Sequence, residues 1–182
     1  MKDPVQLRFS GAGGQGLITA GVILSEAAML DGLNVVQTQT YGPEARLGSS
    51  KAEVIISTRH IAYPEVTVPD VLLCMSHEAA KKYMPKVRAD TVVVVDSTCV
   101  SSDFTGPGRH VRMPITDTAI TVGSKVVANA VALFAINTIE PVVSRESLLQ
   151  AITARVPAKY RELNQRAALA GEELAKNTLA AL

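Results

Sequence analysis

The chain has 182 residues, of which 47% are apolar and 19% are charged, the proportions of a soluble globular protein long enough to cover both faces of a sheet. Its formal net charge of +1 and its aromatic content of 4% exclude a broad basic field and an aromatic stacking platform, so we expect no nucleic-acid partner. No run approaches about 18 uninterrupted apolar residues and the first residues carry no apolar signal core, so we expect a cytoplasmic protein without membrane contact.

The stretch Ser10–Gly16 predicts a tight turn between a strand and a helix. Apolar alternation over Val5–Phe9 predicts the strand, and a helical apolar pattern over Leu17–Leu30 predicts the helix. Such a glycine turn has two interpretations: its bare backbone and the helix N-terminus bind a phosphate, or its glycines only let the helix pack on the sheet. On the first interpretation the candidate cofactor-binding residues are Gly11, Gly13, Gly14, Gln15 and Gly16.

One further test separates a dinucleotide site from other phosphate sites. A dinucleotide fold carries an acidic residue about 20 residues after the turn, at the end of the second strand, to bind the ribose hydroxyls. The second strand is predicted over Val35–Thr40 and contains no carboxylate, and Glu44 is the first acid after it. The sequence therefore argues against a nicotinamide or flavin dinucleotide and leaves phosphate binding open.

Strand and helix patterns alternate along the rest of the chain. After a loop over Tyr41–Ser50, alternation predicts a strand over Lys51–Thr58 that is less buried than the others. Later strands are predicted over 71–75, 91–96 and 110–113, and helices over 78–84, 124–136, 145–154 and 158–176, with caps at Ser76, Ser144 and, for one more helix start, Thr116 and Asp117. This order predicts an α/β fold: a single three-layer α/β/α domain over 1–182 with a mostly parallel, Rossmann-like sheet.

In such a sheet, ligands bind beyond the carboxyl ends of the strands. That edge would collect the glycine turn, the Tyr41–Ser50 loop and the segment after Asp96. The Asp96 carboxylate either accepts N–H bonds from its own loop or faces the cleft, and we favour the structural role. Asn129, inside an apolar helical pattern, needs hydrogen-bond partners if buried and is a candidate for binding the loop ends.

The chain has two cysteines, Cys74 and Cys99, far apart and outside any C-x-x-C pattern. An iron–sulfur cluster takes about four thiolates, so this chain cannot bind one by itself, and we expect both cysteines to be buried as small hydrophobic residues. The sequence has no serine-nucleophile motif, no metal-ligand cluster and no Walker lysine. We therefore predict no catalytic residue and no metal site.

The turn and the loop after the second strand together resemble a known family. G-x-G-G-Q-G over 11–16, followed by Y-G-P-E-x-R over 41–46, is similar to the gamma subunit of 2-oxoacid:ferredoxin oxidoreductases, and the similarity extends over nearly the whole chain. The resemblance implies a subunit of an enzyme that oxidatively decarboxylates a 2-oxoacid with coenzyme A and reduces ferredoxin. It favours 2-oxoglutarate as the oxoacid, with pyruvate, 2-oxoisovalerate and indolepyruvate versions as alternatives.

The resemblance also assigns cofactors and partners. It places thiamine diphosphate and the iron–sulfur clusters in alpha, beta and delta chains, makes coenzyme A a substrate of the complex, and brings ferredoxin to the complex as a whole. This chain would then bind no cofactor alone, be inactive alone, help to assemble the complex and line its coenzyme A side, and form a homodimer when isolated. Two other classes stay open: a free-standing nucleotide-binding Rossmann domain, and a scaffold whose glycine turn binds nothing.

The loop that matches the family supplies the remaining candidate residues. Arg46 either binds a phosphate or carboxylate through a bidentate fork, pairs with Glu44 or a partner's acid, or is solvated. Tyr41 has an apolar ring and a polar hydroxyl, which suit an interface as well as a site. The predicted partner or ligand residues are Tyr41, Gly42, Glu44, Arg46 and Asn129.

Overall fold

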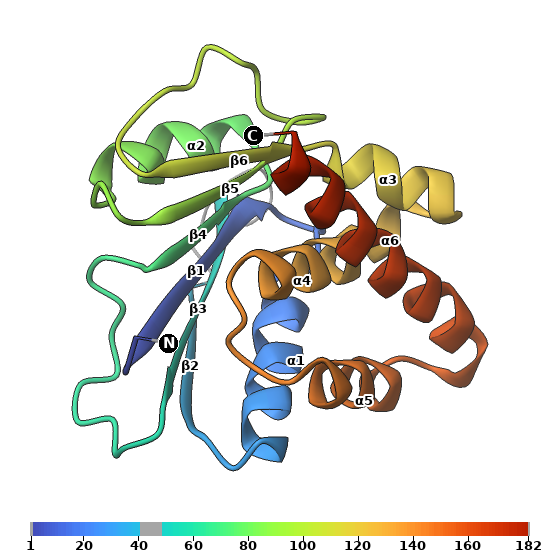
Figure 1. Ribbon diagram of the computed structural model, residues 1–182, viewed down its shortest axis with the longest axis horizontal. Helices are drawn as coiled ribbons and strands as arrows, with labels where there is room; N and C mark the ends of the chain where they lie inside the picture. The colour runs from blue at the N-terminus through green and yellow to red at the C-terminus, as the bar shows by residue number, and fades with distance from the viewer. Residues whose placement is uncertain (1, 41–48, 182) are drawn as a thin grey trace.

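The computed structural model describes residues 2–40 and 49–181, which form a six-stranded sheet with helices on both faces (Figure 1). Across the sheet, the strand order is β2-β3-β1-β4-β5-β6. The strands are β1 Val5–Ala12, β2 Asn34–Thr40, β3 Ser49–Ser57, β4 Val71–Cys74, β5 Val92–Asp96 and β6 Arg109–Met113. The helices are α1 Leu17–Leu30, α2 His77–Tyr83, α3 Ile115–Val122, α4 Ala128–Ile139, α5 Arg145–Arg155 and α6 Arg161–Ala180.

The sheet is mostly parallel, as the sequence predicts. β1, β4, β5 and β6 pair in parallel, whereas β3 is antiparallel to both of its neighbours, β1 and β2. Two antiparallel steps restore the direction, so β2 runs the same way as β1. The carboxyl ends of β1, β2, β4, β5 and β6 therefore meet at one edge of the sheet, where the strand-to-helix turns lie.

The expectation that the strand over Lys51–Thr58 is less buried than the others is wrong. β3 lies between β1 and β2, and its residues 52–57 are buried. The polar residue that suggested exposure, Glu53, is buried in an ion pair with Arg8 (Nη2···Oε1 2.6 Å), and Lys51 Nζ lies 2.7 Å from its other oxygen. The strand that is partly exposed along its whole length is β2, because it is the outermost strand of the sheet and has a neighbour on one side only.

The helices form two unequal layers, which confirms the predicted three-layer arrangement. Figure 1 shows α2 on one face of the sheet and α1, α3, α4, α5 and α6 on the opposite face. Two of the predicted helix caps are present: the Ser76 hydroxyl accepts from Ala79 N at 3.2 Å, and the Ser144 hydroxyl accepts from Ser147 N at 3.1 Å. Capping satisfies N–H groups that a helix leaves without an internal partner. α1 has the bounds that the apolar pattern predicts.

α4 is the buried helix of the larger layer, and α6 packs directly against it. The contact is close because α6 carries a glycine at the crossing: a Cβ built on Gly171 would lie 2.3 Å from the carbonyl oxygen of Val131 in α4. The buried apolar residues of α6 are also small: Ala167, Ala168 and Ala175 belong to the same core cluster as the buried residues of α4. The C-terminal helix therefore reaches the middle of the fold only because its side chains there are small.

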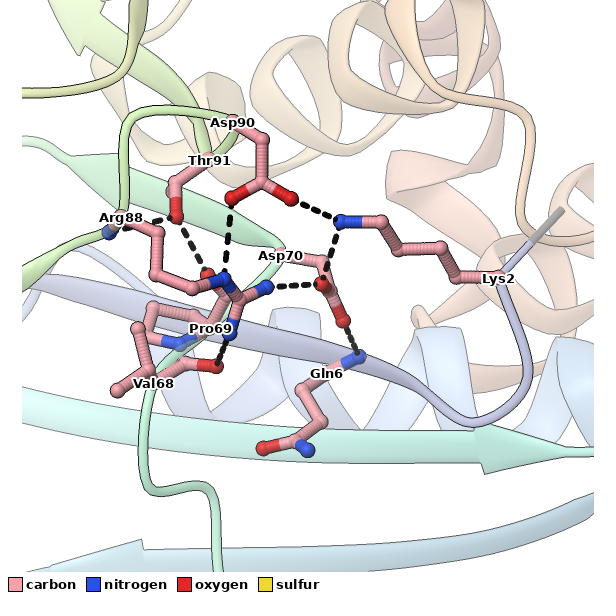
Figure 2. Close-up of polar contacts among 8 residues, drawn as sticks. All are labelled: Lys2, Gln6, Val68, Pro69, Asp70, Arg88, Asp90 and Thr91. Atoms are coloured by element: carbon pink, nitrogen blue, oxygen red, sulfur yellow. Dashed lines mark hydrogen bonds and ion pairs between the residues drawn. The ribbon is translucent and has the colours of Figure 1, made fainter.

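An ion network joins the segments that precede β4 and β5, at the opposite end of the strands from the glycine turn (Figure 2). The Asp70 carboxylate, just before β4, accepts from Gln6 N of β1 at 2.9 Å, from Arg88 Nη2 at 2.6 Å and from Lys2 Nζ at 3.2 Å. Asp90 bridges Lys2 and Arg88 from the solvent side, at 2.7 and 3.0 Å. Because Asp70 accepts from the backbone of β1, it also fixes how β1 and β4 lie relative to each other.

Substituting Gly171 by Ala tests the α4–α6 contact. Helix propensity alone would make Gly171→Ala stabilising by about 1 kcal/mol. We expect the reverse, a loss of roughly 1–3 kcal/mol in the free energy of unfolding, because the new Cβ overlaps the Val131 carbonyl. Urea unfolding of the full chain measures the difference. Gly106→Ala is the control, since its nearest described neighbour would lie at an ordinary 3.5 Å. A stabilised Gly171→Ala chain would contradict this packing.

Asp70 and Asp90 belong to the same ion network but differ in how far their side chains are exposed to solvent. Alanine variants of the two therefore form a matched pair. The Asp70 side chain is 11% exposed and that of Asp90 57%. We expect Asp70→Ala to cost about 1–3 kcal/mol in unfolding free energy, because it leaves Gln6 N unpaired. Asp90→Ala should have a small effect that disappears in about 1 M NaCl, where exposed charges are screened. If both variants lost the same unfolding free energy in high salt, the hydrogen bond from Gln6 N to Asp70 would not contribute to stability.

Candidate functional site

The glycine turn joins β1 to α1 at the carboxyl edge of the sheet. β1 continues to Ala12, three residues beyond the predicted end, and α1 begins at Leu17. Gly14 and Gly16 have φ of 85° and 72°, the left-handed region that favours glycine. Gly16 is the N-cap residue of α1, and no described side chain caps the helix there. The first-turn N–H groups and the positive end of the helix dipole are thus open to an anion.

The glycines of the turn do different things. A Cβ on Gly11 would lie 2.2 Å from Gln15 Oε1, and one on Gly16 would lie 2.8 Å from Asn129 Nδ2, so a larger residue at either position would displace an amide side chain that contacts the turn. At Gly14 no described atom lies within 4 Å of a built Cβ. Gly13 and Gly14 are exposed. The packing interpretation therefore accounts for Gly11 and Gly16, and the open backbone that a ligand needs is at Gly13 and Gly14.

The side chain of Gln15 points into the protein. Its Oε1 accepts from Ala12 N at 2.7 Å, and its Nε2 donates to the carbonyl oxygen of Met75 at 2.7 Å. Met75 directly follows β4. The amide thereby connects the turn to the end of the neighbouring strand, and both of its polar atoms are used by backbone groups.

Asn129 lies in the first turn of α4 and braces the other end of the glycine turn. Its Nδ2 donates to the carbonyl oxygen of Gly16 at 3.4 Å, and its Oδ1 accepts from Ala130 N at 2.9 Å. Asn129 therefore bonds the carboxyl end of the turn, and its role toward a ligand or partner stays a prediction.

A pocket of about 380 Å³ opens beside the turn. Three separate segments line it: the turn with the start of α1, the approach to α4, and the chain between α5 and α6. Among the described residues that line the pocket none is charged; they are Gly14, Gly16, Thr19, Ser124, Val126, Val127, Asn129, Val156, Pro157, Tyr160, Leu163 and Asn164. The pocket lining is therefore neutral and combines backbone, amide and hydroxyl groups with apolar side chains.

The sequence did not indicate the contribution of the C-terminal segment to this pocket. Tyr160 and Asn164 belong to the start of α6, about 150 residues after the turn, and Asn164 Nδ2 donates to the carbonyl oxygen of Tyr160 at 2.9 Å. The one usable signal was Gly171, because a glycine within an alanine-rich helix marks close packing on another element.

The predicted residues Tyr41, Gly42, Glu44 and Arg46 lie outside the described residues. Their described neighbours are informative: Thr40 pairs with Lys51, and Ser49 pairs with Ala12 at the end of β1. The chain thus leaves and re-enters the sheet at the edge that carries the glycine turn.

Asp96 has the structural role that we favoured. Its carboxylate is fully buried and accepts from Thr98 N at 3.1 Å, from Thr116 N at 3.3 Å and from the Thr116 hydroxyl. The prediction that Thr116 and Asp117 cap a helix start is wrong, because the N-cap position of α3 is Pro114. Asp96 instead supplies the acceptor for the first turn of that helix, because a proline has no side-chain oxygen.

The two cysteines lie in different surroundings. Cys74 is buried, and burial raises the pKa of its thiol to about 12. Cys99 is only half-buried, contrary to expectation, and its Sγ lies 3.6 Å from the Thr116 hydroxyl. Within residues 2–40 and 49–181, no three His, Cys, Asp or Glu side chains come together as metal ligands. In the same ranges no helix has the length and apolarity needed to cross a membrane.

Comparison with known proteins agrees with this geometry. Residues 6–174 match the family model of pyruvate ferredoxin/flavodoxin oxidoreductase. The 2-oxoglutarate synthase subunit KorC of Methanocaldococcus jannaschii is 45% identical over 176 residues, 94% of each chain, and that of Methanothermobacter marburgensis is 44% identical over 93% of this chain and 95% of its own.

Solved structures give the same result. The crystal structure of the gamma subunit of keto/oxoacid ferredoxin oxidoreductase from Geobacter sulfurreducens is 44% identical, with a TM-score of 0.85 over 95% of this chain and 99% of that one. A 2-oxoglutarate:ferredoxin oxidoreductase from Magnetococcus marinus shares the fold, with a TM-score of 0.88 at 24% identity over 97% of this chain and 32% of that one. From its glycine turn to its C-terminal helix, the chain therefore belongs to the pyruvate ferredoxin/flavodoxin oxidoreductase family.

Proposed function

We propose that residues 1–182 form the gamma-type subunit of a cytoplasmic 2-oxoglutarate:ferredoxin oxidoreductase. The supporting observation is a gap in identity between relatives. Those named as 2-oxoglutarate synthase subunits are 42–45% identical to the chain, whereas the ketoisovalerate, pyruvate and indolepyruvate enzymes' subunits are 30–31% identical. Three of these 2-oxoglutarate synthase subunits also match over at least 94% of their own length.

In the proposed reaction, 2-oxoglutarate and coenzyme A give succinyl-coenzyme A and carbon dioxide, and the two electrons released reduce ferredoxin. This chain does not fit an iron–sulfur cluster, because a cluster takes about four thiolates and the chain has only Cys74 and Cys99, the first of them buried. We therefore assign the clusters and thiamine diphosphate to alpha, beta and delta chains. The gamma-type chain is inactive alone.

The proposed contribution of this chain is a binding surface for coenzyme A. Gly13 and Gly14 expose backbone at the N-terminus of α1, where free N–H groups and the helix dipole favour a phosphate. The neutral pocket beside them has room for an uncharged part of the same molecule. Tyr41, Gly42, Glu44 and Arg46 follow β2 in the sequence, and we assign them to contacts with the ligand or with partner chains.

Partner chains are proposed to cover the rim of the pocket. Val126 is 81% exposed and Tyr160 is 45% exposed, although both have large apolar surfaces. Apolar side chains gathered at a pocket rim indicate an interface. In the isolated chain the same surface is expected to drive self-association into a homodimer.

Purification of the tagged chain from its native host tests the assignment. We expect alpha, beta and delta chains to co-elute, and the complex to reduce ferredoxin only with coenzyme A present. The ratio kcat/KM should favour 2-oxoglutarate over pyruvate, 2-oxoisovalerate and indolepyruvate by about tenfold or more, the discrimination that roughly 1.4 kcal/mol gives. Preference for another oxoacid would overturn the 2-oxoglutarate assignment. A chain recovered alone that binds NAD would support the free-standing nucleotide-binding domain instead.

The phosphate site is tested by a matched pair of glycine variants. Gly14 and Gly32 have φ of 85° and 74°, no described atom lies within 4 Å of a Cβ at either position, and they lie at opposite ends of α1. Asparagine tolerates this backbone conformation. In Gly14→Asn the added side chain would occupy the open space through which a phosphate approaches the backbone N–H groups. We therefore expect this variant to lose charge-assisted bonds and to raise the KM for coenzyme A about tenfold or more. The KM for the oxoacid should be unchanged. Gly32→Asn should change neither, and equal effects of both variants would count against the site.

A further inference from the structure

The glutamine of the glycine turn occupies a definite place in the hydrogen-bond ladder between β1 and β4. In a parallel ladder, a residue that donates its N–H to the neighbouring strand accepts, with its own carbonyl oxygen, from the residue two positions further along that strand. Met75 N donates to Ser10 O at 2.9 Å. The regular next donor to Met75 O is therefore Ala12 N.

The Gln15 side chain stands between those two groups. Ala12 N donates to Gln15 Oε1, and Gln15 Nε2 donates to Met75 O, each at 2.7 Å. One direct backbone bond is thus replaced by two bonds through a primary amide. The ends of β1 and β4 are held apart by the width of that amide, and the space above Gly11 is filled by it, since a Cβ on Gly11 would lie 2.2 Å from Oε1.

The amide chemistry at this position is specific. The site needs an acceptor for Ala12 N and a donor for Met75 O on one short planar group, which glutamine supplies. Glutamate of the same length has an acceptor in place of the donor. A carboxylate there would face the Met75 carbonyl oxygen and would bring negative charge to the N-terminus of α1.

We propose that Gln15 is a positioning residue that sets where the exposed backbone of Gly13 and Gly14 stands, and so sets the affinity of the turn for coenzyme A. Gln15 holds the turn from the side of β4, and Asn129 holds Gly16 O from the side of α4. Gly13 and Gly14, between these two attachments, are the exposed part. In this proposal Gln15 acts without touching the ligand, because its amide is directed at Ala12 N and Met75 O. This inference rests on the proposed coenzyme A site at the turn.

Removing the amide leaves a direct route for the ladder. In Gln15→Ala, Ala12 N is free to bond directly to Met75 O, so no buried polar group loses its partner. The fold is then expected to survive while the turn moves toward β4. A displacement of about 1 Å in a positioning element can reduce activity by as much as 100-fold. The expected effect is thus on coenzyme A and not on stability.

The experiment compares Gln15→Ala, Gln15→Glu and the surface control Gln150→Ala in the assembled complex. We expect both Gln15 variants to raise the KM for coenzyme A about tenfold or more, with Gln15→Glu the worse because of its charge. The KM for 2-oxoglutarate, kcat at saturating coenzyme A, assembly by size exclusion and the melting temperature should match those of Gln150→Ala.

Each other result overturns the inference in a distinguishable way. If neither Gln15 variant changes the KM for coenzyme A while Gly14→Asn raises it, the site stands and Gln15 has no positioning role. If Gly14→Asn has no effect but Gln15→Ala does, Gln15 contacts the ligand itself. If Gln15→Ala raises both KM values together with a lower melting temperature, its role is only structural. If no variant changes the KM for coenzyme A, the proposed site falls as well.

Discussion

The constraint on which this structure depends is the close approach of two amide side chains to the backbone of the β1–α1 turn. There is no room for a Cβ at Gly11 beside Gln15 or at Gly16 beside Asn129. With glycine at both positions, β1 ends against β4 and α1 begins against α4, so the first strand and first helix are both buried centrally. α1 then crosses β3 to reach β2, so β2 ends and β3 begins at the edge that carries the turn. The layout of the candidate site follows from that one turn.

The two edges of the sheet are held by different chemistry. At the edge where β4 and β5 begin, full charges of Lys2, Asp70, Arg88 and Asp90 join the strands (Figure 2). At the carboxyl edge the glycine turn is held by two neutral amides, those of Gln15 and Asn129. A carboxylate would have competed with an incoming phosphate for the same N–H groups. Because the amides of Gln15 and Asn129 carry no charge, the positive potential of the turn stays available to a ligand.

The sequence predicted what local pattern determines and missed what distant contacts determine. The bounds of α1, the caps at Ser76 and Ser144 and the mostly parallel sheet follow from periodicity and capping, which are local. The burial of β3 was misjudged because Glu53 looks exposed until Arg8, 45 residues earlier, is placed beside it. Gln15 was predicted as a ligand residue for its place among the glycines, and nothing near it in the sequence indicates Met75, 60 residues away. Likewise, only the packing of α6 on α4 shows that Tyr160 and Asn164 line the pocket.

If coenzyme A binds at the turn as proposed, the electrostatics of the pocket explain why other chains would have to complete the binding site. A helix N-terminus provides roughly half a positive charge, and the described lining adds no charged side chain. Coenzyme A carries several negative charges on its phosphates, so the turn by itself balances only a fraction of them. On that proposal the remaining positive charge would come from beyond this lining, either from Arg46 or from partner chains that would cover the rim at Val126 and Tyr160. A surface of this kind would orient one phosphate, and tight binding would then depend on the assembled enzyme.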